Sequence, residues 1–361
     1  HLRERFPARA EWIHFALTSE DVNNLAYGLI FREYAEKLQR PLLESVIRKL
    51  LELAERWENA PFPAKTHGQP ASPSTAGKEL AVFAARLARQ LGQLKAFRFR
   101  GKLNGATGNW SAFAAADPDF DWIAFSRRFV ESLGLEFNPT TTQIEDHDAW
   151  SEWFSIVRRI NMILLDLDVD AWEYISRGYF VQRKKDGEVG SSTMPHKVNP
   201  IKFENSEGNL VLADSLLSTL SERLCHSRMQ RDLSDSTVVR NVGVALAHSH
   251  LAWQETLAGL GRIELDAAAC RAELEREPQL LAEPYQIVLR RAGRKDAYGQ
   301  LKELTRGRAV ALADFHRLLD AGGLDETLQA RLRALDVPGY VGLAPRVCRE
   351  ARDAAEKELA K

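Results

Sequence analysis

Residues 153–171 read WFSIVRRINMILLDLDVDA, and this stretch decides the fold class. Its apolar side chains recur at intervals of three and four residues, which places them on one face of an α-helix. That face consists of Trp153, Val157, Ile160, Leu164, Leu167 and Ala171. A stripe of about five turns is typical of long helices that pack together in a bundle.

The same periodicity continues on both sides of this stretch. A second stripe consists of Leu80, Phe83, Leu87, Leu91 and Leu94, and further helical runs cover 25–57, 204–224 and 236–261. Pro41 lies inside the first run and removes a backbone donor, so we expect a kink or a break near residue 40. Strand patterns are weak and confined to 98–110, and the chain is therefore predicted to be all-α.

The pattern changes near residue 262. Beyond it the predicted helices are shorter, the composition is rich in Ala, Arg, Leu and Glu, and proline and glycine interrupt the runs. This change predicts a central helical-bundle domain over 14–261 and a C-terminal helical domain over 262–361. Residues 1–13 are interpreted as the remnant of an N-terminal domain.

Composition excludes several function classes. The 361 residues include 49 Lys and Arg against 50 Asp and Glu, a net charge of −1, so no global basic field favours nucleic acid or an anionic membrane. A membrane-spanning helix is not expected, because no run of about 18 apolar residues occurs. Cys225, Cys270 and Cys348 form no C-x-x-C pair and are expected to be reduced thiols in the cytoplasm.

Four polar stretches interrupt the helical pattern: HFALTSEDVNN (14–24), KTHGQPASPST (65–75), GSSTMPHKVNPIKFENSEGN (190–209) and SRMQRDLSDSTVVRN (227–241). The first has a purely structural interpretation, in which Thr18 or Ser19 caps a helix whose first turn is acidic. In the second, a lone loop histidine such as His67 is usually just solvated.

The fourth stretch has two interpretations. Arg231, Ser236 and Arg240 would suit a phosphate if a loop leading into a helix start brought them together, since such a start offers unpaired N–H groups. Alternatively, the stretch is a surface patch of salt bridges.

Taken together, these stretches carry a family resemblance. Residues 190–200 match the G-S-S-x-M-P-x-K-x-N-P loop of the fumarase/aspartase superfamily at every fixed position. His196 within that loop, with TSEDVNN, THGQP, TTQIEDHD (141–148) and RDLSDSTVVRN, resembles the adenylosuccinate lyase family in its longer bacterial form. The resemblance covers essentially the whole chain.

The resemblance implies a fold of three mostly helical domains. The central bundle would assemble into a homotetramer with a twenty-helix core, and each active site would collect residues from three subunits. Members carry an N-terminal domain with further substrate contacts, and this chain is expected to lack it. Substrate binding is expected to be weakened if the chain as given is the whole molecule.

The implied activity is β-elimination of fumarate in purine biosynthesis. Adenylosuccinate would give AMP, and succinyl-aminoimidazole-carboxamide ribotide (SAICAR) would give the carboxamide product (AICAR). Removing a proton beside a carboxylate builds a dianion, so the site needs a base, donors for the new charge and an acid for the leaving nitrogen.

The resemblance also implies roles for four residues. Ser191 matches the general base, a hydroxyl that must be activated by desolvation and nearby donors. Lys197 is the cation that stabilises the developing charge. His67 matches the general acid, and Glu204 the carboxylate that pairs with this histidine and raises its affinity for the proton.

Substrate contacts are implied for a larger set. The contacts are His14, Thr18, Ser19, Thr66, Gln143, Ser192, Val198, Asn199, Asn205, Arg231, Ser236, Thr237, Val238, Val239 and Arg240. The residues from Arg231 to Arg240, with His14, would hold the phosphate and ribose. Lys65 replaces an arginine found in many members, which keeps the charge and loses the bidentate fork.

No metal and no cofactor are implied. The histidines include no H-x-x-x-H pattern, and His248 and His250 are interpreted as structural. Two alternatives stay open: a sister lyase acting on another succinyl-amine or on fumarate, and a lyase fold kept for a binding role without turnover. The phosphate-gripping pattern argues against the first alternative, and the intact Ser191, His67 and Lys197 against the second.

Overall fold

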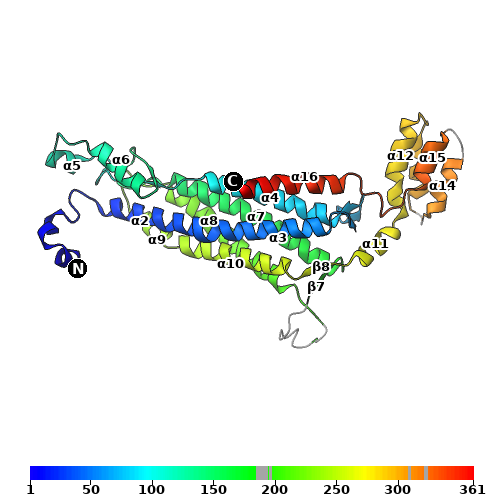
Figure 1. The fold of residues 1–361 in the computed structure, drawn as a ribbon, viewed down its shortest axis with the longest axis horizontal. Helices are drawn as coiled ribbons and strands as arrows, with labels where there is room; N and C mark the ends of the chain where they lie inside the picture. The colour runs from blue at the N-terminus through cyan, green and yellow to red at the C-terminus, as the bar shows by residue number, and fades with distance from the viewer. Residues whose placement is uncertain (184–193, 195–196, 308–309, 321–323) are drawn as a thin grey trace.

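The structure is a computed structural model that describes residues 1–183, 194, 197–307, 310–320 and 324–361. Figure 1 shows an elongated bundle of long helices with a group of shorter helices at one end. The prediction of an all-α fold is confirmed, because strands are few and short throughout these ranges. None of the helices described there combines the length and the apolar character that a bilayer crossing requires.

The bundle is built from long helices that pack in a ring. They are α3 (Arg40–Arg56), α4 (Ala76–Ala96), α7 (Asp148–Ser176), α8 (Ile201–Leu224) and α10 (Val242–Leu260). Each packs on the next in this order, and α10 closes the ring against α3. Helix α2 (Ser19–Tyr34) leads into α3 and extends the bundle towards its N-terminal end (Figure 1).

The predicted apolar face of α7 forms the centre of this bundle. All six side chains of the stripe are at most 1% exposed. Trp153 donates its indole N–H to Oε1 of the buried Gln39 at 3.0 Å, and the rings of Phe31 and Phe99 pack beside it. The indole nitrogen therefore stays hydrogen-bonded while the ring system fills the core.

Pro41 does not break the helical run. A π-helical turn, η2 (Ala35–Gln39), lies directly before it, and the proline occupies the first turn of α3. A π turn widens the helix by one residue and shifts the hydrogen-bond pattern where the proline has no N–H to offer. The chain therefore passes from α2 to α3 without a loop.

Short strands pair at both ends of the bundle. Antiparallel pairs join β1 (Pro61–Phe62) to β4 (Ser74–Thr75), β2 (Lys65–Thr66) to β3 (Gln69–Pro70) and β7 (Phe180–Gln182) to β8 (Ile263–Leu265). The weak strand pattern near 98–110 corresponds to β5 (Arg100–Gly101), which pairs in parallel with β6 (Glu136–Phe137).

Smaller helices complete the described chain. Towards the N-terminal end of the bundle lie α1 (Leu2–Arg5), η1 (Pro7–Trp12), α5 (Ser111–Ala116), α6 (Trp122–Ser132) and α9 (Ser234–Val239). At the opposite end, a separate group consists of α11 (Ala267–Glu275), η3 (Pro278–Leu281), α12 (Ala282–Arg291), α13 (Ala297–Thr305), α14 (Leu312–Asp320) and α15 (Glu326–Arg333). This group encloses a second apolar core, in which Tyr285, Leu289 and Phe315 are buried.

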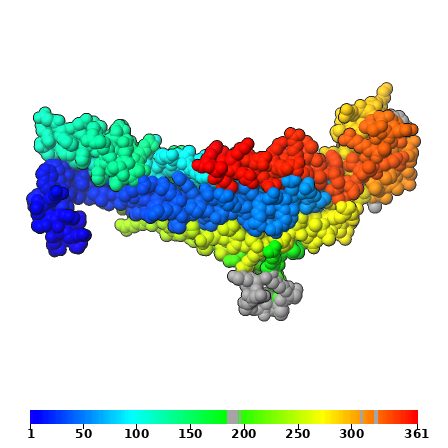
Figure 2. Space-filling model, viewed as in Figure 1, coloured from blue at the N-terminus to red at the C-terminus, as the bar shows by residue number. Residues whose placement is uncertain are grey.

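The last helix, α16 (Ala344–Ala360), leaves that group and returns to the bundle. It packs on α4 and α3, and its Cys348 and Ala355 belong to the bundle core. Figure 2 shows its surface lying along the bundle, with the smaller group protruding at one end. The division of the chain at residue 262 stays a prediction, and the bundle core contains side chains from both sides of that point.

Candidate active site

The predicted site residues lie at two ends of the bundle. One set, here called the α2 end, lies around the starts of α2 and α7 and consists of His14, Thr18, Ser19, Gln143, Arg231, Ser236, Thr237, Val238, Val239 and Arg240. The other, the hairpin end, lies beyond the end of α7 and consists of Thr66, His67, Lys197, Val198, Asn199, Glu204 and Asn205. Ser191 and Ser192 lie outside the described residues.

Helix α7 separates the two sets. Its 29 residues correspond to about 40 Å of helix. Near its end, Tyr174 packs against Phe62, just before the strands that carry His67, and Trp172 reaches Glu204 at the start of α8. Near its beginning, the loop that carries Gln143 contacts the segment before α9. A single copy of the chain therefore does not bring the predicted residues together.

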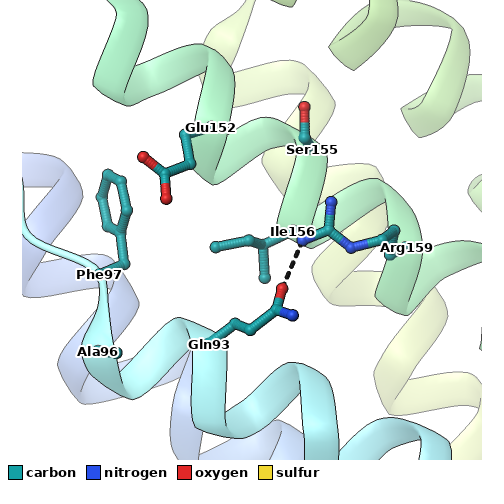
Figure 3. Close-up of a pocket in the computed structure, with 7 residues that line it drawn as sticks. All are labelled: Gln93, Ala96, Phe97, Glu152, Ser155, Ile156 and Arg159. Carbon is teal, nitrogen blue, oxygen red and sulfur yellow. Dashed lines mark hydrogen bonds between the residues drawn. The ribbon is translucent and has the colours of Figure 1, made fainter.

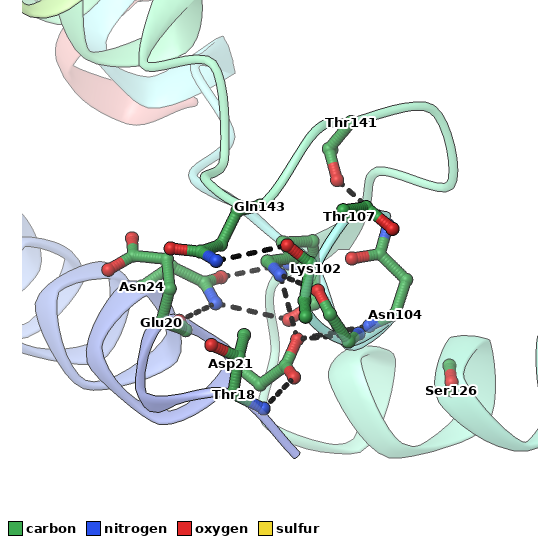
Figure 4. A network of polar contacts seen from close by, with 12 residues as sticks. Thr18, Glu20, Asp21, Asn24, Lys102, Asn104, Thr107, Ser126, Thr141 and Gln143 are labelled. Carbon is green, nitrogen blue, oxygen red and sulfur yellow. Dashed lines mark hydrogen bonds and ion pairs between the residues drawn. The ribbon is translucent and has the colours of Figure 1, made fainter. Parts of the chain in front are cut away.

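At the α2 end, Thr18 is the N-cap residue of α2, which confirms the capping interpretation. Its backbone N–H donates to Oδ2 of Asp21 at 2.9 Å. The other oxygen of Asp21 lies 2.9 Å from Nζ of Lys102, and both side chains are 0% exposed. Figure 4 shows that this ion pair sits between α2 and the loops that carry Asn104 and Gln143.

Gln143 connects two polar loops. Its side-chain amide donates to the carbonyl of Ala106 at 3.0 Å, and its backbone N–H donates to the carbonyl of Gln230 at 3.2 Å. Burial raises the pKa of nearby Glu20 to about 7, against the lowering effects of Arg231 and Lys102. The α2 end therefore gathers charges of both signs in a poorly solvated place.

The segment expected to hold a phosphate is built around an ion pair. Arg231 donates through Nη1 to Oδ2 of Asp235 at 2.8 Å. The hydroxyl of Ser236 donates to the carbonyl of Leu233 at 2.9 Å, and Arg240 is exposed. Both interpretations of the sequence keep support: Arg231 belongs to a salt bridge, and Ser236 lies within the first turn of α9.

Sequence reasoning missed two buried groups in TTQIEDHD. Burial, with the neighbouring Asp146, raises the pKa of Glu145 to about 7, and Asn138 donates to this carboxyl at 3.1 Å. His147 precedes α7 with φ +63°, and its Nδ1 lies 3.1 Å from the carbonyl of Leu224. Burial lowers the pKa of His147. The signal available was the position of the acidic pair directly after the apolar Ile144.

At the hairpin end, His67 occupies the tip of a tight turn. Strands β2 and β3 are joined by two residues, His67 with φ +54° and Gly68 with φ +74°. Two consecutive positive φ values are typical of the type I′ turn, whose twist matches that of a hairpin. The imidazole therefore stands exposed on a short, geometrically defined support.

Two carboxylates from the C-terminal group of helices hold this hairpin. Lys65 lies 2.7 Å from Oε1 of Glu273 on α11, and the hydroxyl of Tyr179 donates to the same oxygen at 2.6 Å. Burial acts to raise the pKa of Glu273, but the hydrogen bonds from Lys65 and Tyr179 outweigh it and lower the pKa. On the other side of the turn, Ser72 donates to Glu283 of α12.

Among the described residues, no hydrogen bond or ion pair joins the start of α8 to His67. Oε1 of Glu204 accepts the indole N–H of Trp172 at 3.0 Å, and no hydrogen bond between described residues joins Glu204 to His67. Asn205 accepts from Asn209 at 3.0 Å, and Lys197 is exposed. The pairing of Glu204 with His67 stays a prediction.

A cavity of about 420 Å³ lies elsewhere, between α4 and α7 (Figure 3). Arg159 spans it and donates to Gln90 at 2.9 Å and to Gln93 at 2.6 Å, and Glu152 and Phe97 face the same space. None of the predicted site residues lines this cavity. Within the described ranges, no three His, Cys, Asp or Glu side chains gather in a way that would hold a metal ion.

Comparison with known proteins extends these observations. A family model described as "Lyase" matches residues 3–213, and one described as "Adenylosuccinate lyase C-terminal" matches residues 227–341. Adenylosuccinate lyase of Escherichia coli (strain K12) is 47% identical over 337 residues, which cover 93% of this chain and 74% of that protein. Adenylosuccinate lyase of Haemophilus influenzae is 46% identical over 335 residues, with coverages of 93% and 74%.

Solved structures share the fold at low sequence identity. The 3-carboxy-cis,cis-muconate lactonizing enzyme from Pseudomonas putida superposes with a TM-score of 0.82 at 21% identity, covering 99% of this chain and 80% of that one. Fumarate lyase from Mesorhizobium sp. BNC1 superposes with a TM-score of 0.79 at 18% identity, covering 94% and 78%. These likenesses support the all-α bundle.

Proposed function

The chain belongs to the adenylosuccinate lyase family of the fumarase/aspartase superfamily, and we propose that it eliminates fumarate from adenylosuccinate, giving AMP, and from SAICAR, giving AICAR. The observation that carries this proposal is 47% identity over 93% of the chain to a protein named for that reaction. The chain is thus a carbon–nitrogen lyase of purine nucleotide biosynthesis, acting on small molecules, and we place it in the cytoplasm.

In the proposed reaction, Ser191 removes the proton beside the succinyl carboxylate and Lys197 stabilises the dianion that results. His67 then protonates the departing nitrogen, with Glu204 as its partner. The position of His67 supports this role, because the turn exposes the imidazole while the Lys65–Glu273 pair and the Ser72–Glu283 bond fix both sides of the hairpin.

We further propose a homotetramer in which different copies complete each site. The two sets lie at opposite ends of α7, which is about 40 Å long, so in one chain they are too far apart to act on a single small molecule. Large apolar side chains are also exposed along α2, η2, α7, α8 and α10, which favours burial against other copies. They include Ile30, Leu38, Met162, Val169, Val211, Leu212, Val244 and Leu251.

Turnover is tested directly by incubating the purified chain with adenylosuccinate and following the ultraviolet absorbance as AMP forms. Absence of any change at high enzyme concentration would sink the proposal. Ser191→Ala and His67→Ala should each be inactive. A mixture of His67→Ala with Arg240→Ala, a variant of the α2 end that is expected to raise KM strongly, should recover part of the wild-type activity at low substrate concentration. Recovery is expected because some sites in mixed assemblies receive both intact residues; no recovery would count against the shared site.

A further inference from the structure

The ion pair between Asp21 and Lys102 is completely buried at the α2 end of the bundle. Taking two charges out of water is expensive, and apolar side chains of similar volume often stabilise a fold as well or better. A buried pair is therefore weak evidence of a contribution to stability alone. Its other partners indicate what it does instead.

Both oxygens of Asp21 are fully engaged. Oδ2 accepts the backbone N–H of Thr18, while Oδ1 accepts the backbone N–H groups of Asn104 at 3.0 Å and Gly105 at 3.3 Å, in addition to Lys102. The ammonium of Lys102 also donates to the carbonyl of Gly105 at 3.1 Å. One carboxylate thus ties the start of α2 to the turn that follows β5.

Asn24 fixes the backbone of Lys102 from the next turn of α2. Its Oδ1 accepts the N–H of Lys102 at 2.8 Å, and its Nδ2 donates to the carbonyl of Lys102 at 3.1 Å. The lysine is consequently held at its backbone and at its ammonium group by the same helix. Such a double attachment restricts rotation and translation of the 102–108 segment against α2.

The 102–108 segment in turn contacts the loop that carries Gln143. Asn104 donates to the hydroxyl of Thr141 at 2.8 Å, and the Gln143 amide donates to Ala106. Gly108 has φ +77°, and a Cβ added there would lie 2.1 Å from the carbonyl oxygen of Thr141. Only glycine permits this approach, so the two segments meet backbone to backbone.

We propose that Asp21 and Lys102 are a positioning pair that sets the distance between the Thr18 loop and the Gln143 loop (Figure 4). Because both side chains are completely buried, we assign them a role that acts through the two loops and not directly on the substrate. The kinetic part of this inference rests on the proposed function, in which Thr18 and Gln143 hold substrate; the geometric part does not.

The test compares two variants of the full chain with wild type. Lys102→Met leaves a buried carboxylate unpaired, and the double variant Asp21→Asn/Lys102→Met removes both charges at nearly constant volume, so that it keeps the fold if the single variant does not. Amide hydrogen exchange is measured over 14–20, 104–108 and 141–143. In the same samples, kcat and KM for adenylosuccinate and the thermal midpoint are determined.

For the double variant we expect faster exchange in all three segments and a KM raised about tenfold or more, with kcat changed less. A merely structural role would lower the amount of active enzyme and leave KM unchanged. Lys95→Met is the control, because its 3.2 Å ion pair with Glu44 joins α4 to α3 in the middle of the bundle; all three segments should exchange as in wild type.

Unchanged exchange in the three segments of the folded double variant overturns the inference, whatever the kinetics. Faster exchange with a KM within twofold of wild type overturns its kinetic part. If wild type itself does not turn over adenylosuccinate, the proposed function fails, and the exchange measurement still decides whether the pair positions the loops.

Discussion

The two ends of the bundle hold their predicted residues in different ways. At the α2 end, Asp21 and Lys102 are both 0% exposed and contact loops that fold onto the bundle itself. At the hairpin end, Lys65 and Glu273 keep 19% and 30% of their side-chain surface exposed, and Glu273 comes from a separate group of helices. The α2 end is thus held by a buried ion pair within the bundle, and the hairpin end by a partly exposed ion pair to α11.

This difference has energetic consequences. Salt and water screen the charges of the hairpin end, where exposed pairs typically contribute about 1 kcal/mol or less. Buried charges are hardly screened, and removing one partner leaves the other without compensation. The α2 end should therefore respond strongly to substitutions and weakly to salt, whereas the hairpin end should respond in the opposite manner.

The largest effect is expected for His67→Ala. Losing a general acid should reduce kcat by about 10²–10⁴-fold, while the thermal midpoint and the assembly stay as in wild type because the side chain is exposed. Steady-state kinetics and size-exclusion chromatography check both. A kcat close to that of wild type would show that the hairpin end does not supply the general acid.

Lys102→Met should have the largest effect on stability. We expect the free energy of unfolding to fall by about 3–5 kcal/mol, because the Asp21 carboxylate is left buried without its cation. Denaturant titration at low and at 0.5 M salt measures this fall. A loss that disappears in high salt would show that the α2 end is solvated, like the hairpin end.

Glu20→Gln should change the pH dependence of stability. Burial raises the pKa of Glu20 from 4.5 to about 7. Below pH 4.5 the carboxyl is protonated in both the folded and the unfolded state, so its charge costs no stability. Between pH 4.5 and 7 the unfolded state ionises first, and the loss in free energy of unfolding grows with pH. Above pH 7 the variant should be more stable than wild type by about 1–3 kcal/mol, and at pH 5 the gain should be smaller.

Thermal midpoints at pH 5 and pH 8 check this expectation. Glu33→Gln on the exposed side of α2 is the matched control, since the hydrogen bond from Lys37 lowers the pKa of Glu33 and no gain at high pH is expected. An equal gain for Glu20→Gln at both pH values would mean that its charge plays no part.

The smallest effect is expected for Glu273→Gln. The amide keeps hydrogen-bonding capacity towards Lys65 and Tyr179 and loses only a partly solvated charge, so stability should fall by about 1 kcal/mol or less. The fall should vanish at 0.5 M salt in denaturant titration. A loss of several kcal/mol in the free energy of unfolding that does not depend on salt would show that the hairpin end is as poorly screened as the α2 end.

Much of the fold was predictable because it rests on local periodicity. The stripes of α4 and α7 are buried as expected, since a helix in a bundle must bury one face. Of the kink or break expected near Pro41, the break does not occur, because a π turn keeps the chain helical there. That turn depends on bundle packing, which the sequence does not display locally. The return of α16 was not foreseen, since its Ala- and Arg-rich composition resembles an exposed helix.

The candidate site was predictable in its residues and not in its arrangement. Motif positions identified Thr18 and His67, whereas their placement at opposite ends follows from the uninterrupted helical run of α2, η2 and α3 that lies between them. Lys102 escaped notice because it lies in a glycine-rich stretch that predicts only a weak strand. A buried ion pair joins residues 81 positions apart, from 21 to 102, and no local pattern reports such a contact.

The return of α16 to the bundle also determines how the smaller group of helices can move. That group leaves the bundle after β8 and re-enters it at α16, so two covalent crossings attach it rather than one. The first crossing is also held by packing, because α11 contacts β1 and its Cys270 belongs to the bundle core. Glu273 and Glu283 bond to Lys65 and Ser72, which lie on the two sides of the His67 turn. A displacement of α11 or α12 would therefore move the hairpin and, with it, the imidazole. The position of the smaller group of helices is thus coupled to the position of His67.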